Sequence, residues 1–202
     1  MVKTKEEIEL DLLAKAREII KDKGLEFLTA RKLSDYSGYS VGTIYNQFKS
    51  MDNLVMWLNT VTIEELYDRL ERVEKTSDVY KNLNALLDKF VEFVLENKNL
   101  WFTLYNFHFK SVTDKYDIGD LRSLERKKIV KILWLLEDNL DKLFMNVQNN
   151  ERTLSAEVLF VTMFSISSLL TTENKFTRIN KKYLVKVLFN TYLAGMSCLA
   201  KK

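Results

Sequence analysis

Apolar residues recur every three or four positions along most of this 202-residue chain, which is the spacing that lines one face of an α-helix. The long helices predicted from this spacing occupy about 5–23, 51–73, 78–97, 120–145, 154–173 and 180–199. Between them the sequence predicts a break at 97–99, a loop at 111–119 and a polar turn at 148–150. Thr4 and Glu7 form a capping-box pattern before the first of them, and Gly24 ends it. Proline is absent and glycine occurs only five times, so little interrupts the helical pattern. The pattern predicts an all-α protein of about nine helices.

Residues 28–54 predict two short helices joined by a tight turn. Thr29 can cap the first helix, because its hydroxyl can accept hydrogen bonds from amides of the first turn. Gly38 supplies the positive φ that ends it, and Ser40 caps the second helix. Ile44 and Phe48 fall on one side of this second helix. Two short helices joined by a glycine turn form the skeleton of a helix-turn-helix DNA reader. We therefore expect an N-terminal three-helix DNA-binding domain.

The second short helix has a composition suited to a DNA groove. Its first residues are small, so its backbone can approach phosphates and base edges closely, and later side chains can form hydrogen bonds or carry charge. The candidate DNA-binding residues of this helix and its cap are Ser40, Val41, Gly42, Thr43, Tyr45, Gln47 and Lys49. Ser50 can cap the next helix, and Asp52 is favourable in its first turn.

These residues also carry a resemblance to a known family. The pattern reads Gly42-Thr43-Ile44-Tyr45-x-x-Phe48-Lys49-Ser50, followed by an acidic residue and Leu54. It resembles the tetracycline-repressor (TetR) family of one-component regulators over about 50 residues, while the rest of the chain matches in helical pattern and length. Two positions depart from the family, which often has Lys where this chain has Met51 and Val where it has Tyr39.

The resemblance implies a homodimeric repressor that binds a palindromic operator on double-stranded DNA and leaves it when a small molecule enters the C-terminal domain. By resemblance, the phosphate contacts would be Thr29, Thr43, Tyr45 and Lys49. The residues facing base edges would be Val41, Gly42 and Gln47. The implied division is a DNA-binding domain at 1–50 and a ligand-binding and dimerisation domain at 51–202. The helix from Met51 has no Gly or Pro, so it can transmit a movement between the two. The alternative is that this helix simply joins two packed units.

Charge adds only a local indication of a DNA partner, because the net charge of the chain is +3. Residues 1–60 hold nine basic and nine acidic side chains, which cancel. Within residues 28–50, Arg31, Lys32 and Lys49 face the single anion Asp35. The positive charge is therefore local, and we expect modest affinity with a shallow salt dependence.

The last two predicted helices are apolar almost all round, whereas a surface helix needs only one apolar face. Small residues that permit close helix approach lie along them: Ser165, Ser168, Ala194 and Gly195. A two-fold interface of four helices would use the extra apolar surface and present two DNA readers. A larger core within one chain is the alternative.

Aromatic side chains in the C-terminal part can line a site for a hydrophobic or aromatic effector. The candidate ligand-binding residues are Trp101, Tyr105, His108, Trp134, Phe160 and Phe164. Tyr105 and His108 lie three residues apart on one helical face and could orient a ligand. The alternative is that these residues are ordinary core aromatics.

Other functions have little support in the sequence. His108 and Cys198 are the only histidine and cysteine, so neither a His/Cys metal cluster nor a cofactor site is indicated, and catalysis would have to use Tyr105 and His108. A single cysteine and a charged N-terminus without an apolar run fit a cytoplasmic protein that does not enter membranes. A helical ligand-binding or protein-interaction module that has lost DNA binding is the remaining alternative.

Overall fold

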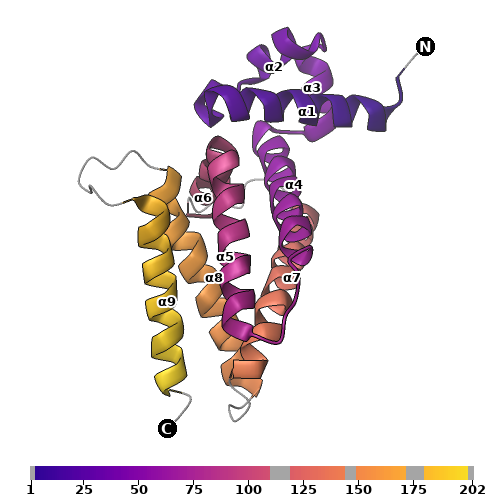
Figure 1. Cartoon of the computed structure of the whole chain (residues 1–202). Coiled ribbons are helices and arrows are strands. Elements are labelled where there is room, and N and C mark those ends of the chain that lie inside the picture. The colour runs from indigo at the N-terminus through magenta and orange to yellow at the C-terminus, as the bar shows by residue number, and fades with distance from the viewer. Residues whose placement is uncertain (1–2, 110–118, 144–148, 172–179, 200–202) are drawn as a thin grey trace. The chain divides into compact units, whose positions relative to one another are not determined.

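The computed structural model describes residues 3–109, 119–143, 149–171 and 180–199, and helices are the regular secondary structure within these ranges. The elements are α1 (Lys5–Lys23), the 3-10 helix η1 (Leu25–Phe27), α2 (Ala30–Ser37), α3 (Val41–Phe48), α4 (Met51–Glu71), α5 (Val79–Glu96), α6 (Lys98–Phe109), α7 (Gly119–Leu143), α8 (Asn149–Thr171) and α9 (Lys181–Leu199). Nine α-helices and no strand within the described ranges confirm the all-α prediction (Figure 1).

The helices form two compact units. One unit holds Met1–Glu64 with Asn97–Arg126, and the other holds Glu65–Glu96 with Lys127–Lys202. Helix α4 is unbroken and contributes residues to both, so the prediction of a continuous helix without a flexible linker is confirmed. Since α6 joins the N-terminal helices in one unit, a functional boundary after residue 50 stays a prediction.

Helices α1, α2 and α3 share one apolar core in the first unit. Helix α1 contributes Leu12, Leu13, Ala16, Ile19 and Ile20 in helical steps, all buried. Helices α2 and α3, together with the start of α4 and of α6, contribute Leu33, Ile44, Phe48, Leu54, Leu58 and Leu100. Burial stabilises the fold by roughly 2 kcal/mol for each large side chain, and it is needed because helices of eight residues are marginal alone.

Side-chain caps determine where the short helices begin and end. Thr29 Oγ1 accepts a hydrogen bond from Lys32 N at 3.2 Å, and Ser40 Oγ accepts one from Thr43 N at 3.0 Å. Gly38 ends α2 in the left-handed conformation, with φ +76°. The predicted sequence of cap, glycine turn and second cap is therefore confirmed.

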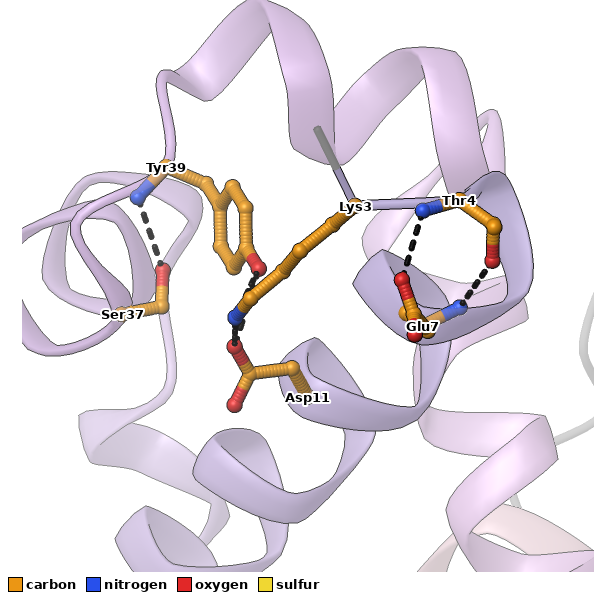
Figure 2. A network of polar contacts seen from close by, with 6 residues as sticks. All are labelled: Lys3, Thr4, Glu7, Asp11, Ser37 and Tyr39. Carbon is orange, nitrogen blue, oxygen red and sulfur yellow. Dashed lines mark hydrogen bonds and ion pairs between the residues drawn. The ribbon is translucent and has the colours of Figure 1, made fainter. Parts of the chain in front are cut away.

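The two flanking helices begin at caps as well. Thr4 Oγ1 accepts from Glu7 N at 3.2 Å while Thr4 N donates to Glu7 Oε2 at 2.8 Å, which is the predicted capping box (Figure 2). Gly24 follows α1 with φ +84°. Ser50 Oγ accepts from Asn53 N at 3.0 Å, so Ser50 caps α4 as expected.

In the second unit, α8 lies beside both α5 and α9 (Figure 1). Helix α9 buries every fourth residue, namely Val185, Phe189 and Leu193. Helix α8 buries Leu159, Met163, Phe164 and Leu170. Apolar side chains on the other sides of these two helices are exposed: Val158, Val161, Tyr183, Val187 and Leu188. Both helices therefore carry apolar surface that the described residues leave exposed.

Two helix starts differ from the prediction. A polar turn was expected at 148–150, but α8 already includes Asn149 and Asn150, while residue 148 lies outside the described residues. A break was expected at 97–99, but α6 begins at Lys98. Asn is well suited to helix starts, where its side chain can bond free amides, so it marks a beginning as readily as a loop. The expected loop at 111–119 lies outside the described residues except for Gly119, the first residue of α7.

Candidate nucleic-acid interface

Helix α3 presents a continuous outer face to solvent. Ile44 and Phe48 are buried at 1% and 3% exposure, and they anchor one side of the helix in the core. The exposed positions are Val41, Gly42, Tyr45, Asn46 and, just after the helix, Lys49. These positions recur at steps of one and four residues, so they form one helical face. A partner could contact this outer face without displacing the core, because the core residues of α3 lie on the opposite side.

The predicted DNA-contacting residues at the start of α2 and α3 also cap these helices. Thr29 is exposed and caps α2. Ser40 is exposed, and its hydroxyl lies 2.9 Å from the Thr43 hydroxyl as well as accepting from Thr43 N. The two hydroxyls cluster at the N-terminus of α3, where free amides and the helix dipole favour an anion such as phosphate.

Gln47 is the predicted contact that lies apart from the outer face. Its side chain is half-buried, and its Nε2 donates to the Lys5 backbone oxygen at 3.0 Å and to Glu9 Oε2 at 2.9 Å. Both acceptors lie on α1, so Gln47 joins α3 to α1. Its predicted role at a base edge stays a prediction.

Lys49 ends α3 with an unusual backbone. It has φ +67° and ψ −39°, and it is the non-glycine residue with positive φ in the described part of the chain. Its N–H bonds the Tyr45 carbonyl at 2.9 Å, and its Nζ donates to the Asn46 carbonyl at 3.3 Å. A lysine is therefore held at the end of the outer face in a conformation that usually favours glycine.

Tyr39, one of the two departures from the family pattern, takes part in a polar network near the turn (Figure 2). Lys3 Nζ donates to Asp11 Oδ2 at 2.7 Å and to Tyr39 Oη at 2.9 Å, and Tyr39 Oη donates to the same Asp11 oxygen at 2.9 Å. The hydrogen bond from Lys3 lowers the pKa of the Asp11 carboxyl, and the bond from Tyr39 lowers it further. The network attaches Lys3, two residues before α1, and Asp11 of α1 to Tyr39 in the turn before α3.

The six predicted ligand-binding residues are divided between the two units. Trp101 is fully buried and Tyr105 half-buried in the first unit, while Trp134 in the second unit is 61% exposed. Phe160 and Phe164 do lie together, with ring centroids 6.2 Å apart. His108 belongs to α6, but its side chain lies outside the described residues. Ligand contact by these residues stays a prediction.

A groove of about 350 Å³ lies between α5 and α9. Its lining residues are Leu87, Asp88, Val91, Glu92, Asn180, Lys182, Tyr183 and Lys186. Lys186 Nζ lies 3.3 Å from Asp88 Oδ2 across it. The groove includes none of the six residues expected to bind ligand. Sequence reasoning could not have found it, because its two walls come from helices about 100 residues apart.

Among the described residues, no three or more His, Cys, Asp or Glu side chains are grouped so that they could hold a metal ion. Within the same ranges, no helix combines the length and the apolar character needed to cross a membrane.

Comparison with known proteins gives a family match over the helices just described. Residues 12–56 match the family described as bacterial regulatory proteins, tetR family. The HTH-type transcriptional repressor KstR2 of Mycolicibacterium smegmatis is 24% identical over 123 residues. The aligned part spans 59% of this chain and 59% of that repressor, so less than two thirds of that relative is matched.

Solved structures share the fold along nearly the whole chain. The transcriptional regulator FadR from Bacillus subtilis, solved in complex with stearoyl-CoA, matches with a TM-score of 0.70 and 16% identity, covering 92% of this chain and 98% of FadR. A transcriptional regulator from Rhodococcus sp. Rha1 matches with a TM-score of 0.68 and 17% identity, covering 93% and 96%. At these identities the similarity shows a common fold.

Proposed function

Residues 12–56 belong to the tetR family of bacterial regulatory proteins, and from this premise we propose that the chain is a ligand-responsive transcriptional repressor. It binds a palindromic operator as a homodimer and is released by a small hydrophobic effector. Residues 1–50 read DNA, residues 51–202 bind the effector and form the dimer, and the protein acts in the cytoplasm without a catalytic step. The observation that carries the proposal is the exposed outer face of α3, capped by Ser40 and ended by Lys49.

Support for the dimer comes from α8 and α9. Val161 is 57% exposed and Tyr183 is 65% exposed, although each is a large apolar side chain. Exposed Ser165, Ala194 and Gly195 are small enough to let a second pair of helices approach closely. A symmetric four-helix interface would cover this surface and give the protein two copies of α3, as two half-sites about one turn of DNA apart require.

The effector class is supported by the pair Phe160 and Phe164 and by the relative that was solved with stearoyl-CoA. An acyl thioester is therefore the first effector to try. It can release the operator only if it binds better to a dimer whose two α3 helices are spaced wrongly for DNA. The continuous α4 can carry that change, because it belongs to both units.

Selection of bound duplexes from a random DNA pool tests the proposal. We expect enrichment of a palindrome, and weaker binding to it when stearoyl-CoA is added. Tyr45→Phe removes one hydroxyl at a position that is 44% exposed, so it should weaken binding several-fold at fixed salt without unfolding the chain. Tyr80→Phe is the matched control, because Tyr80 is 43% exposed on α5. No enriched sequence would leave only the ligand-binding or protein-interaction module.

A further inference from the structure

The outer face of α3 has a centre that can be located from helix geometry. Ile44 and Phe48 point into the core, and the direction midway between them defines the inner side. At about 100° per residue, Asn46 lies about 180° from that direction and Gln47 only about 80° from it. Asn46 is therefore the outermost side chain of α3, while Gln47 lies on its flank.

The flank on which Gln47 lies is the side that α1 covers. Gln47 Nε2 donates two hydrogen bonds to α1, one to the Lys5 carbonyl and one to the Glu9 carboxylate. A Gln that reads adenine must donate from this same amide nitrogen. Reading a base would therefore require Gln47 to leave two partners, one of them charged.

The side-chain amide of Asn46, unlike that of Gln47, is not bonded to α1. Asn46 is exposed, and within the described part of the chain its side-chain amide has no hydrogen-bond partner, since Lys49 bonds only its backbone oxygen. Its Oδ1 can accept from the adenine amino group while its Nδ2 donates to N7, which is the bidentate pairing of Asn with adenine in the major groove.

Gly42 adds an independent observation one helical turn before Asn46. A Cβ at this position would meet only Ser40 Oγ, at 3.6 Å, which is an ordinary contact. The chain itself therefore has room for alanine, which is also the better helix former. The absence of a side chain at Gly42 lets the groove approach the helix more closely beside Asn46. Asn46 needs this close approach, because its amide is joined to the backbone by a single methylene and reaches only a short distance.

We propose that Asn46 reads an adenine in each half-site of the operator, and that Gln47 is a positioning residue that fixes α3 on α1. The inference deepens the proposed function and rests on it, because it needs an operator to read. The inference assigns base specificity to the amide of Asn46, one residue before Gln47, which the sequence alone indicated.

The test compares Asn46→Ala with Gln47→Ala in the full-length chain, by selection from a random duplex pool at fixed salt and by thermal unfolding followed by circular dichroism. Asn46→Ala should lower the preference for adenine at one position in each half-site by roughly ten-fold, with a melting temperature no lower than that of wild type, because alanine is the better helix former. Gln47→Ala should keep every base preference, bind more weakly to all sequences, and melt at a lower temperature, because the bonds to α1 are lost. Gly42→Ala should melt higher than wild type and bind the operator more weakly.

The outcomes separate the inference from the proposed function. A wild-type chain that enriches no sequence overturns both. A wild-type palindrome whose base preferences survive Asn46→Ala, or change with Gln47→Ala, overturns the inference and leaves the regulator intact. A Gln47→Ala variant that melts like wild type overturns the positioning role, whatever the DNA result.

Discussion

Lys49 is the residue where charge and backbone conformation conflict most clearly. Its φ of +67° places its Cβ against its own backbone, which costs about 1 kcal/mol for a residue other than glycine. Glycine would remove that cost but would also remove the cation at the end of the outer face of α3. Lys49 therefore combines a cation with a backbone conformation that glycine would adopt without strain.

Two variants separate charge from backbone strain at position 49. Lys49→Gly and Lys49→Ala both lose the cation, but only glycine tolerates the positive φ, so Lys49→Gly should be more stable by about 1 kcal/mol in urea unfolding. Both should bind the operator equally weakly, with a salt slope that is shallower by about one for each half-site. Equal stability of the two variants would contradict the strain.

The network of Lys3, Asp11 and Tyr39 makes a second prediction, about acid stability. The pKa of Asp11 is lowered in the folded chain, so its ionised form stabilises the fold above the ordinary carboxyl pKa, and that contribution is lost as the pH falls through the lowered value. Wild type should therefore exceed Asp11→Asn in stability at neutral pH. Urea unfolding at a series of pH values should show the two converging below about pH 4. A difference that stays constant down to pH 2 would exclude this role for Asp11.

At the scale of the element, α3 depends on its first cap. An eight-residue helix gains little from its own hydrogen bonds, so the bond from Thr43 N to Ser40 Oγ is a large part of its local stability. The same cap lies beside the expected phosphate. Folding therefore requires a hydrogen-bond acceptor at position 40, whereas DNA binding requires that this position carry no negative charge.

Substitutions of Ser40 should separate these demands. Ser40→Ala removes the acceptor and should cost about 1 kcal/mol of stability. Ser40→Asp keeps an acceptor and suits the positive end of the helix dipole, so it should be as stable as wild type. It should nevertheless bind the operator more weakly than Ser40→Ala, because a carboxylate repels phosphate. Thermal unfolding and a gel shift measure the two effects, and tight operator binding by Ser40→Asp would argue against a phosphate at this cap.

At the scale of the whole molecule, the exposed sides of α8 and α9 are what the proposed dimer needs. Apolar surface from both helices would remain in water in a single chain, and its burial stabilises an interface in proportion to its area. A two-fold axis repeats each contact, so one substitution acts twice.

Val161→Glu tests the dimer directly. Val161 is 57% exposed in the single chain, so the substitution should leave thermal unfolding of the monomer nearly unchanged. Two carboxylates buried without partners should raise the dimer dissociation constant at least about 100-fold, as measured by sedimentation velocity, and abolish operator binding. Tyr80→Glu on α5 is the control and should stay dimeric. A Val161→Glu chain that remains dimeric and binds DNA would place the interface elsewhere.

The sequence by itself determined the helices, their caps and the family. These features are local: a cap joins residues three apart, a glycine turn depends on one φ angle, and the family motif lies within thirteen residues. Apolar spacing likewise identified the side of α3 that enters the core, since Ile44 and Phe48 are both buried. The starts of α6 and α8 were missed because Asn serves both loops and helix ends.

Only the tertiary structure decided which polar side chains of α3 are available to DNA and which are hydrogen-bonded to another helix. Asn46 and Gln47 are adjacent amides that composition cannot rank, and they differ because α1 lies on one side of α3. The partners of Gln47 are 42 and 38 residues away, and Lys3 meets Tyr39 across 36. Such contacts depend on how helices cross, which follows from the packing of all their buried side chains together and cannot be read from the local pattern of any one helix.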